Sequence, residues 1–339
     1  MKKKLVILLL LLYGSHFTNA DIFDILYLTQ IKDLYCNLFE CCNDKTVPYK
    51  LESLQSMLEI KLYGQHIAAE VVLNAVNSHL RKSKPQRPLV MSFHGANGVG
   101  KSYVSKMIAE ALYKNGENSK YFHFYYGLAD FPSNDKNKIN DYQTRLKNEI
   151  QESISNCGRS LFIIDGVDYI APHVLDAIMP FIDCSNCAKK IEKNKSIFIL
   201  LTNTGSKAIE EELLRRMDDG MKRESLSLKD FEMIIIKEVF NHEGPFHKSK
   251  LVQSDAIGFY VPFLPLERQH VKKCIKKAFR ELNFKATENL INIVLEELRF
   301  SPTPNFYSTS GCKRVDQIVG RIYYKANSLN DFNAINNEL

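Results

Sequence analysis

The sequence has no long hydrophobic run after its first residues, no excess of one charge sign beyond a net +6, and no KDEL-type retention tetrapeptide at its end. After residue 20, no segment reaches the roughly 20 apolar residues that a membrane-spanning helix needs. We therefore expect a mature chain that is soluble or only peripherally attached to a membrane. The 45 basic and 39 acidic residues are interspersed, and no basic run alternates with stacking aromatics, so nucleic-acid binding is not expected. The chain ends in Asn-Glu-Leu rather than a KDEL-type signal, so retention would need another cause.

Residues 1–20 have the pattern of a secretory signal peptide. Lys2, Lys3 and Lys4 precede an apolar run from Leu5 to Leu12, and small and polar residues follow up to Ala20. The alternative is an N-terminal membrane anchor, although the run is short for that role. Removing this segment lowers the formal net charge from +6 to about +3. The apolar fraction of 45% is typical of an ordinary globular protein.

Eight cysteines in a chain exported to an oxidising compartment indicate disulfides, but spacing alone does not assign the pairs. Cys184 and Cys187 form a lone Cys-x-x-Cys. A zinc site there would need two more ligands, and only the remote His173 offers itself. We expect a loop disulfide or free thiols instead. The single glycosylation sequon begins at Asn194, which makes Asn194 a candidate glycosylation site if the chain is exported.

Strand and helix patterns alternate through the middle of the chain. Residues 21–50 form a mixed, cysteine-bearing N-terminal arm, and apolar residues then recur at helical spacing from Leu62 up to Asn77. Four runs rich in β-branched or aromatic residues are predicted strands: Leu89–Phe93, Tyr121–Tyr126, Leu161–Ile164 and Ile197–Leu201. Between them lie helical patterns over Val104–Leu112 and Tyr142–Ile154. The alternation predicts a doubly wound α/β fold, in which helices cover both faces of a parallel sheet.

The last part of the chain is mainly helical. Apolar residues recur at helical spacing over Val271–Leu282, Leu290–Leu298 and Val315–Ile322. We therefore predict a large α/β domain over residues 51–263 and a small helical lid domain over residues 264–339. The junction Pro262-Phe263-Leu264-Pro265 is either a hinge or a buried rigid turn.

The most specific motif is a P-loop. Gly95-Ala96-Asn97-Gly98-Val99-Gly100-Lys101-Ser102 matches the pattern G-x-x-x-x-G-K-[ST], follows a predicted strand and opens a predicted helix. The glycines let the backbone wrap around phosphates, so that consecutive N–H groups and the helix N-terminus point at negatively charged oxygens. We expect Lys101 to reach the β- and γ-phosphates of ATP and the Ser102 hydroxyl to ligate Mg²⁺.

Two further strand ends add to this site. The strand from Leu161 is followed by Asp165, at the sheet edge where ligands bind in open α/β folds, and Asp165 is the expected second protein ligand of Mg²⁺. The strand from Ile197 is followed by Thr202-Asn203. The Asn203 amide is expected to orient the attacking water or to contact the γ-phosphate, although on its own it would be more typical of a turn or a helix cap. Asp165 and Asn203 are the predicted catalytic residues.

The order of these parts resembles the AAA+ superfamily, in its Clp-like branch, and the details are similar to torsins over roughly residues 35–324. Besides the P-loop, the resemblance rests on Leu34-Tyr35-Cys36, Glu40-Cys41-Cys42, Tyr63-Gly64-Gln65-His66, Phe198–Asn203, Val261–Leu266 and Gly311-Cys312-Lys313. The last is similar to the torsin sensor-2 motif, which implies that Lys313 approaches the nucleotide and that Cys312 and Cys274 form a redox pair. The resemblance also suggests Cys36 and Cys157 as partners.

The resemblance implies an ATPase of the endoplasmic reticulum lumen and perinuclear space, in agreement with the predicted signal peptide. It also implies homo-oligomers and a membrane-anchored activator, whose lumenal AAA-like domain supplies the arginine finger that torsins lack. Such a finger contributes about 10³ to 10⁵ in rate. Arg215 and Arg216 follow the last predicted strand, where other AAA+ proteins often carry a finger. We expect both to be surface or salt-bridge residues.

Two residues depart from the torsin pattern. Ser102 stands where torsins usually have Asn, and serine is the commoner magnesium ligand among P-loop proteins. Gly166 follows Asp165, where torsins normally have the Glu that positions and activates water. Because glycine has no side chain for this role, hydrolysis is expected to be slow or absent unless another base replaces the Glu. Asp168 is the candidate substitute.

Two functions are consistent with these observations. The first is an ATPase that couples ATP turnover, stimulated by its activator, to remodelling of proteins or membranes. The second is a nucleotide-binding assembly or scaffold protein with little or no hydrolysis, and Gly166 is the argument for it. A P-loop kinase would use the same phosphate cradle but leaves the sensor-2 segment and the helical C-terminal part without a role. Turnover measured with and without an activator separates the first two.

Overall fold

The computed structural model describes residues 35–36, 39–183, 194–241, 244–246, 249–301 and 307–325. The predicted signal peptide, the part of the N-terminal arm before residue 35, and Cys184 and Cys187 lie outside these residues. Within the described ranges, no helix is both long and apolar enough to cross a membrane.

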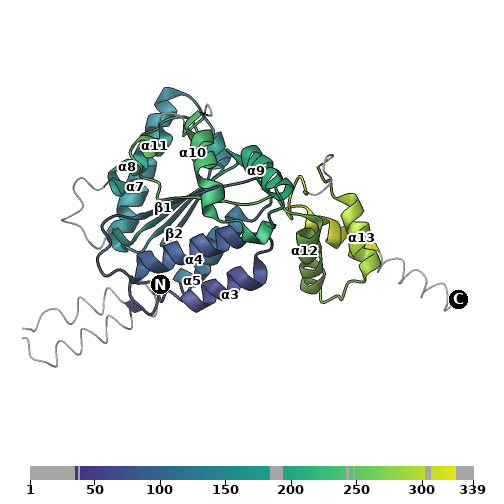
Figure 1. Ribbon diagram of the computed structural model, residues 1–339. Coiled ribbons are helices and arrows are strands. Elements are labelled where there is room, and N and C mark those ends of the chain that lie inside the picture. Colours follow the sequence, from purple (N-terminus) through teal and green to yellow (C-terminus); the bar gives the residue numbers. More distant parts are fainter. Residues whose placement is uncertain are drawn as a thin grey trace, which may run out of the picture.

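The core of the fold is a five-stranded parallel sheet in the order β2-β3-β4-β1-β5 (Figure 1). The strands are β1 (Leu89–His94), β2 (Phe122–Tyr126), β3 (Leu161–Asp165), β4 (Ile197–Thr202) and β5 (Phe259–Pro262). The four predicted strands are confirmed, whereas β5 was not predicted. It is short, it pairs only with β1 at the sheet edge, and it ends in Pro262. An edge strand tolerates proline because one side of it makes no ladder hydrogen bonds.

Side chains along the strands alternate between two faces, and each face is covered by its own helices (Figure 1). Met91 and Ile199 are buried on one face, under α3 (Leu51–Lys61), α4 (His66–Arg81) and α5 (Lys101–Leu112). Val90 and Phe198 are buried on the other, under α7 (Lys136–Asn156), α9 (Ser206–Asp218) and α10 (Glu232–Asn241). Apolar strands covered on both faces are typical of parallel sheets. The predicted doubly wound α/β fold is therefore confirmed.

Shorter elements connect these layers. They are the helices α6 (Gly127–Asp130), α8 (Met179–Ile182) and α11 (Lys250–Gln253), and 3₁₀ turns at Gly116–Asn118, Val167–Tyr169, Val174–Ile178, Arg223–Ser225 and Leu228–Asp230.

The first two helices differ from the sequence prediction. The helix expected from Leu62 to Asn77 is observed as α4, which begins at His66 and ends at Arg81, and a separate helix α3 precedes it. Gly64 separates the two helices with a φ of +69°, and a Cβ at this position would lie 2.8 Å from the ring of His270. Leu62 therefore lies in the connection between the helices, where it lines the cavity described below.

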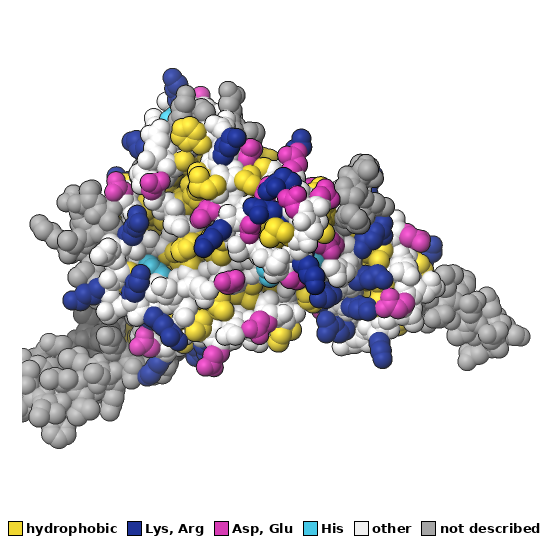
Figure 2. Space-filling model, in the orientation of Figure 1, with side chains coloured by type: hydrophobic (Ala, Val, Ile, Leu, Met, Phe, Trp, Pro, Cys, Tyr) yellow, Lys and Arg dark blue, Asp and Glu magenta, His cyan; other side chains and the backbone are white. Residues whose placement is uncertain are grey.

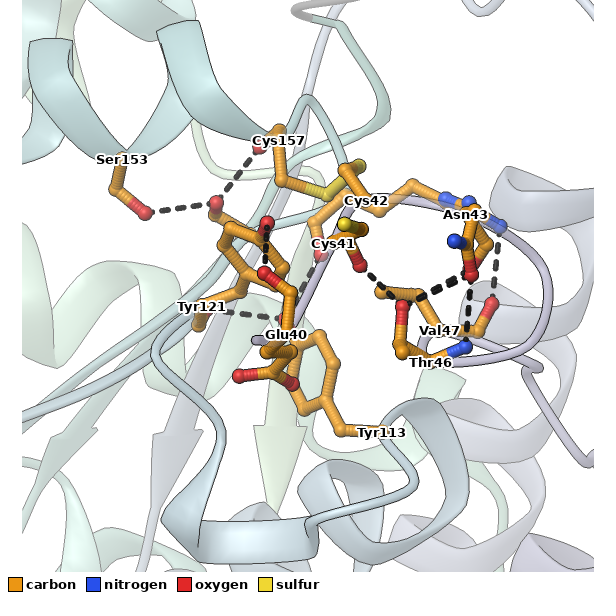
Figure 3. Close-up of a disulfide and its surroundings, with 12 residues drawn as sticks. Glu40, Cys41, Cys42, Asn43, Thr46, Val47, Tyr113, Tyr121, Ser153 and Cys157 are labelled. Atoms are coloured by element: carbon orange, nitrogen blue, oxygen red, sulfur yellow. Dashed lines mark hydrogen bonds between the residues drawn. A yellow bond between two sulfur atoms is a disulfide. The ribbon is translucent and has the colours of Figure 1, made fainter. Parts of the chain in front are cut away.

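A disulfide fastens the N-terminal arm to the sheet layer. Figure 3 shows Cys42 of the arm bonded to Cys157, which caps the end of α7. Glu40 accepts hydrogen bonds from the Ser119 hydroxyl and the Lys120 N–H, both at 2.7 Å. These bonds bring Cys42 to Cys157, whereas Cys36 pairs with Cys41. The expected pairing of Cys36 with Cys157 is therefore wrong.

Among the described residues after β5, three helices lie at one end of the sheet (Figure 1): α12 (Arg268–Glu281), α13 (Glu288–Glu297) and a helix over residues 315–325. Val271 and Ile275 form part of the buried stripe of α12, and a disulfide joins Cys274 of α12 to Cys312. Figure 2 shows several Lys and Arg side chains over α12. Lys277 of α12 lines the cavity at the P-loop, so part of the positive charge of this helix lies at the candidate site.

Candidate functional site

The P-loop runs from the end of β1 to the start of α5, which begins at Lys101. The Lys101 side chain is only 8% exposed. Its Nζ donates hydrogen bonds to the carbonyl oxygens of Gly95 (2.5 Å) and Ala96 (2.8 Å) and to Oδ1 of Asn203 (3.0 Å). Burial lowers the pKa of Lys101 to about 8, while the nearby charges of Asp165 and Asp168 act in the opposite direction. A buried ammonium group held mainly by neutral acceptors is a suitable partner for an anion.

Ser102 and Asp165 lie together at the carboxyl end of β3. The Ser102 hydroxyl donates a hydrogen bond of 2.6 Å to Oδ2 of Asp165. Both oxygens are hard ligands of the kind that Mg²⁺ prefers. Within the described ranges, no group of three or more His, Cys, Asp or Glu residues is arranged to hold a metal. A Mg²⁺ ion at this position would therefore take its remaining ligands from phosphate oxygens and water, as Mg²⁺ usually does.

Asp168 and Asn203 also meet at this edge of the sheet. The Asp168 carboxylate accepts hydrogen bonds from the Thr202 hydroxyl (2.5 Å), the Asn203 N–H (2.7 Å) and both the N–H and the hydroxyl of Thr204 (3.2 and 2.8 Å). The carboxylate thus binds the loop that follows β4. Sequence reasoning considered Asp168 only as a base, because no local pattern reveals that its partners lie 34 to 36 residues further on.

Gly166 adopts a left-handed conformation, with φ 75° and ψ 45°. A Cβ at this position would lie 3.0 Å from the ring of Tyr169. The Tyr169 ring therefore borders the space that a side chain at position 166 would enter. Tyr169 is 50% exposed and lines the cavity next to Asp165.

The turn that carries Lys313 packs directly against the P-loop. The Cys312 N–H donates a hydrogen bond of 3.0 Å to the Gly98 carbonyl oxygen. A Cβ on Gly98 would lie 2.0 Å from the Ser310 carbonyl oxygen, and a Cβ on Gly311 would lie 2.2 Å from the Gly98 carbonyl oxygen. Only glycine at both positions permits this approach of the two backbones. Lys313 thereby reaches the P-loop cavity.

These parts line one cavity of about 650 Å³. The predicted residues that line it are Asn97–Ser102, Asp165, Asp168, Asn203, Cys274, Cys312 and Lys313. Gly95 and Ala96, the first two residues of the P-loop, do not line the cavity, and their carbonyl oxygens accept hydrogen bonds from Lys101. The predicted residues that line the cavity are therefore up to 216 positions apart in sequence, from Asn97 to Lys313.

Gln65 links three segments of the site, and sequence reasoning gave it no role. It is 2% exposed. Its Nε2 donates to the carbonyl oxygens of Val99 (3.1 Å) and Leu264 (2.7 Å), and its Oε1 accepts from the Leu264 N–H (2.8 Å). The segment from Pro262 to Pro265 is buried throughout. The structure therefore favours the buried rigid turn over the hinge at this position.

The structure does not support the role considered for Asn194. Asn194 is 4% exposed, and its Nδ2 donates hydrogen bonds to the carbonyl oxygens of Pro85 (3.1 Å) and Gln86 (2.9 Å). Nδ2 is the atom that would carry a glycan, and in this fold it is buried and hydrogen-bonded. We therefore withdraw Asn194 as a candidate glycosylation site.

Arg215 and Arg216 form ion pairs at the end of α9. Arg215 pairs with Glu212 and Asp219, and Arg216 pairs with Glu212 and Asp230. The expectation that both arginines are salt-bridge residues is confirmed.

A parallel sheet in this strand order, with a P-loop after β1 and polar residues at the ends of β3 and β4, defines an AAA+ fold. Two structures of Hsp104 share it. The Saccharomyces cerevisiae Hsp104–ADP complex matches with a TM-score of 0.58 and 17% identity, over 88% of this chain and 50% of that chain. A closed-state structure of Hsp104 with ATPγS and FITC-casein matches with a TM-score of 0.57 and 17% identity, over 84% and 48%. The chain thus spans about half the length of these Hsp104 chains.

The sequence comparisons are more specific. The Torsin family model matches residues 36–164. A torsin-like protein of Caenorhabditis elegans is 34% identical over 335 residues, which cover 92% of this chain and 93% of the relative. A torsin-like protein of Drosophila melanogaster is 33% identical over 299 residues, with 86% of each chain covered. The chain belongs to the torsin family.

Proposed function

We propose that this torsin-family chain binds ATP together with Mg²⁺ at the P-loop. The observation that carries the proposal is the buried Lys101 ammonium group, held within a glycine-rich loop beside Asn203 and next to the Ser102–Asp165 pair. The residues fit a nucleotide because the cavity combines backbone N–H groups at a helix N-terminus with a lysine and hard oxygen ligands. The Hsp104 complexes with ADP and with ATPγS, which share the fold, support the same assignment.

Each predicted residue has a role in this proposal. Lys101 and the N–H groups of the loop would hold the β- and γ-phosphates, and Ser102 and Asp165 would hold Mg²⁺. Mg²⁺, when bound, would neutralise charge that develops on the transferred phosphate. Asn203 would contact the γ-phosphate or the attacking water, and Lys313 would approach the phosphates from the turn that packs against Gly98.

We further propose that nucleotide binding is coupled to remodelling of proteins or membranes in the endoplasmic reticulum lumen and perinuclear space. In this proposal, residues 51–263 form the nucleotide-binding domain, and residues 264–339 form a lid that senses the nucleotide through Lys313. The protein would form homo-oligomers and act with a membrane-anchored activator that supplies an arginine finger. The ion pairs of Arg215 and Arg216 support the need for a finger from a partner.

A second candidate function is nucleotide-dependent assembly with little or no hydrolysis. The observation that favours it is the left-handed Gly166 beside Asp165, at the position where torsins normally have Glu. The two carboxylates that follow β3 have partners, since Asp165 accepts a hydrogen bond from Ser102 and Asp168 binds the loop after β4. Both carboxylates are thus already bound by donors of this chain, whereas a general base must face the proton that it removes.

Turnover measurements distinguish the two functions. ATP hydrolysis would be measured for the mature chain from Asp21 onward, with and without a torsin-activating lumenal domain. The variants would be Gly166→Glu and Gly166→Ala, because Ala imposes the same backbone strain without a carboxylate. Activated turnover by the wild type supports the ATPase. If the wild type and Gly166→Ala hydrolyse no ATP while Gly166→Glu does, the result supports the assembly protein.

A further inference from the structure

We propose that Asp168 is a positioning residue, which holds the loop at residues 202–204 so that the Asn203 amide faces the nucleotide. The proposal rests on nucleotide binding at the P-loop. It assigns Asp168 a role different from that of a substitute base, and it applies whether or not ATP is hydrolysed.

The first observation is how fully the Asp168 carboxylate is used. It accepts four hydrogen bonds from three consecutive residues: Thr202, Asn203 and Thr204. A carboxylate offers about four lone-pair sites. Three of the four bonds fall on Oδ1, which is therefore fully used, and the fourth joins Oδ2 to the Asn203 N–H. A general base must instead face the proton that it removes.

The second observation is the orientation of the Asn203 side chain. Its Oδ1 accepts a hydrogen bond of 3.0 Å from Lys101 Nζ. Because a lysine ammonium group only donates, the oxygen of the amide must face it. The Nδ2 group remains as the donor of this amide, and Asn203 lines the cavity. A γ-phosphate oxygen is the partner that ATP has and ADP lacks.

The third observation is a second attachment of the same loop. The Thr204 carbonyl oxygen accepts a hydrogen bond of 3.0 Å from Nδ1 of His94, which is fully buried and directly precedes the P-loop. Asp168 thus holds the loop from the end of β3, and His94 holds it from the end of β1. The loop that carries Asn203 is fixed relative to both neighbouring strands.

The test is the discrimination between ATP and ADP. Dissociation constants for Mg²⁺–ADP and for the non-hydrolysable analogue AMP-PNP with Mg²⁺ would be measured calorimetrically on the mature chain and on Asp168→Asn. The Asn variant keeps the shape of the side chain but presents an NH₂ group to donors. We expect AMP-PNP affinity to fall by about tenfold, which corresponds to about 1.4 kcal/mol, while ADP affinity stays unchanged.

A double-mutant cycle with Asn203→Ala shows whether Asp168 acts through Asn203. We expect the AMP-PNP to ADP affinity ratio of the double variant to equal that of Asn203→Ala alone. Thr204→Val removes the hydroxyl, one of the four donors, and is expected to lower the AMP-PNP to ADP affinity ratio less than Asp168→Asn does. Thr204→Ser keeps a hydroxyl and is expected to have the wild-type ratio. The threonine variants keep the proposal testable if Asp168→Asn does not fold.

Other outcomes would overturn the proposal. Equal losses of AMP-PNP and ADP affinity in Asp168→Asn would indicate a general structural role. Unchanged affinities with a loss of turnover alone would indicate a base. If the folded wild type bound neither nucleotide, the proposed nucleotide binding itself would be wrong. If the wild type bound both nucleotides and the variants kept its AMP-PNP to ADP affinity ratio, only the role of Asp168 would be contradicted.

Discussion

Replacing Gly311 with Ala is expected to separate the Lys313 turn from the P-loop. Gly311 has a φ of +53°, and a Cβ there would lie 2.2 Å from the Gly98 carbonyl oxygen and 2.4 Å from its carbon. Both atoms belong to the backbone, so no side chain can rotate to relieve the overlap. The two segments must move apart, and the 3.0 Å hydrogen bond from the Cys312 N–H to Gly98 is lost.

The size of the effect follows from these two causes. A Cβ in the left-handed conformation costs about 1–2 kcal/mol, and loss of the hydrogen bond costs about 1 kcal/mol. We expect the free energy of unfolding to fall by about 2–3 kcal/mol, which urea denaturation at constant m would measure. Displacement of Lys313 is expected to weaken nucleotide affinity by about tenfold, or about 1.4 kcal/mol, which calorimetry with ADP would measure.

Gly220→Ala is the matched control. Gly220 has a φ of +82°, and a Cβ there would meet nothing within 4 Å. This variant therefore carries the same backbone strain, about 1–2 kcal/mol, without a collision, and its nucleotide affinity should equal that of the wild type. If Gly311→Ala matched Gly220→Ala in both stability and affinity, the argument that backbone contact couples the turn to the P-loop would be refuted.

Three further predictions concern charge and covalent bonds. Because burial lowers the pKa of Lys101 to about 8, ATP affinity should fall by up to about tenfold per unit as pH rises above this value. Between this pKa and the ordinary lysine value of 10.5, the free protein should become more stable as pH rises, since the unfolded chain binds more protons there. An ATP affinity and an unfolding free energy that both stay constant across this pH range would contradict the prediction. Replacing Cys42 and Cys157 with Ser should lower the free energy of unfolding by about 2–5 kcal/mol, because the disulfide closes a loop of 115 residues; an unchanged denaturation midpoint would count against it. Cys312→Ser removes the disulfide to Cys274 and should weaken nucleotide affinity, and an unchanged dissociation constant would argue that the disulfide does not hold the Lys313 turn in place.

Much of the fold could be predicted because its signals are local. The strands are short apolar runs bounded by polar residues, and the predicted start of β1 at Leu89 agrees with the structure. The P-loop is contiguous, so its position between a strand and a helix follows from sequence alone. Asp165 and Asn203 could be placed because the carboxyl ends of parallel strands meet at one edge of a sheet.

The remaining features depend on distant contacts. β5 was missed because four residues ending in a proline carry little strand signal, and its pairing with β1 stabilises it. The partner of Cys157 depends on how Glu40 binds the segment at Ser119, which cysteine spacing does not reveal. Burial of Asn194 against Pro85 is likewise a tertiary contact that the sequon does not report.

Equilibrium binding of Mg²⁺–ATP to the mature chain and to Lys101→Ala tests the central claim most directly. We expect calorimetry to detect saturable binding at one site per wild-type chain, and removal of the buried ammonium group to weaken it by at least about tenfold. Equal affinity in the two proteins, or no binding by a wild type that circular dichroism shows to be folded, would contradict the assignment of the P-loop as a nucleotide site.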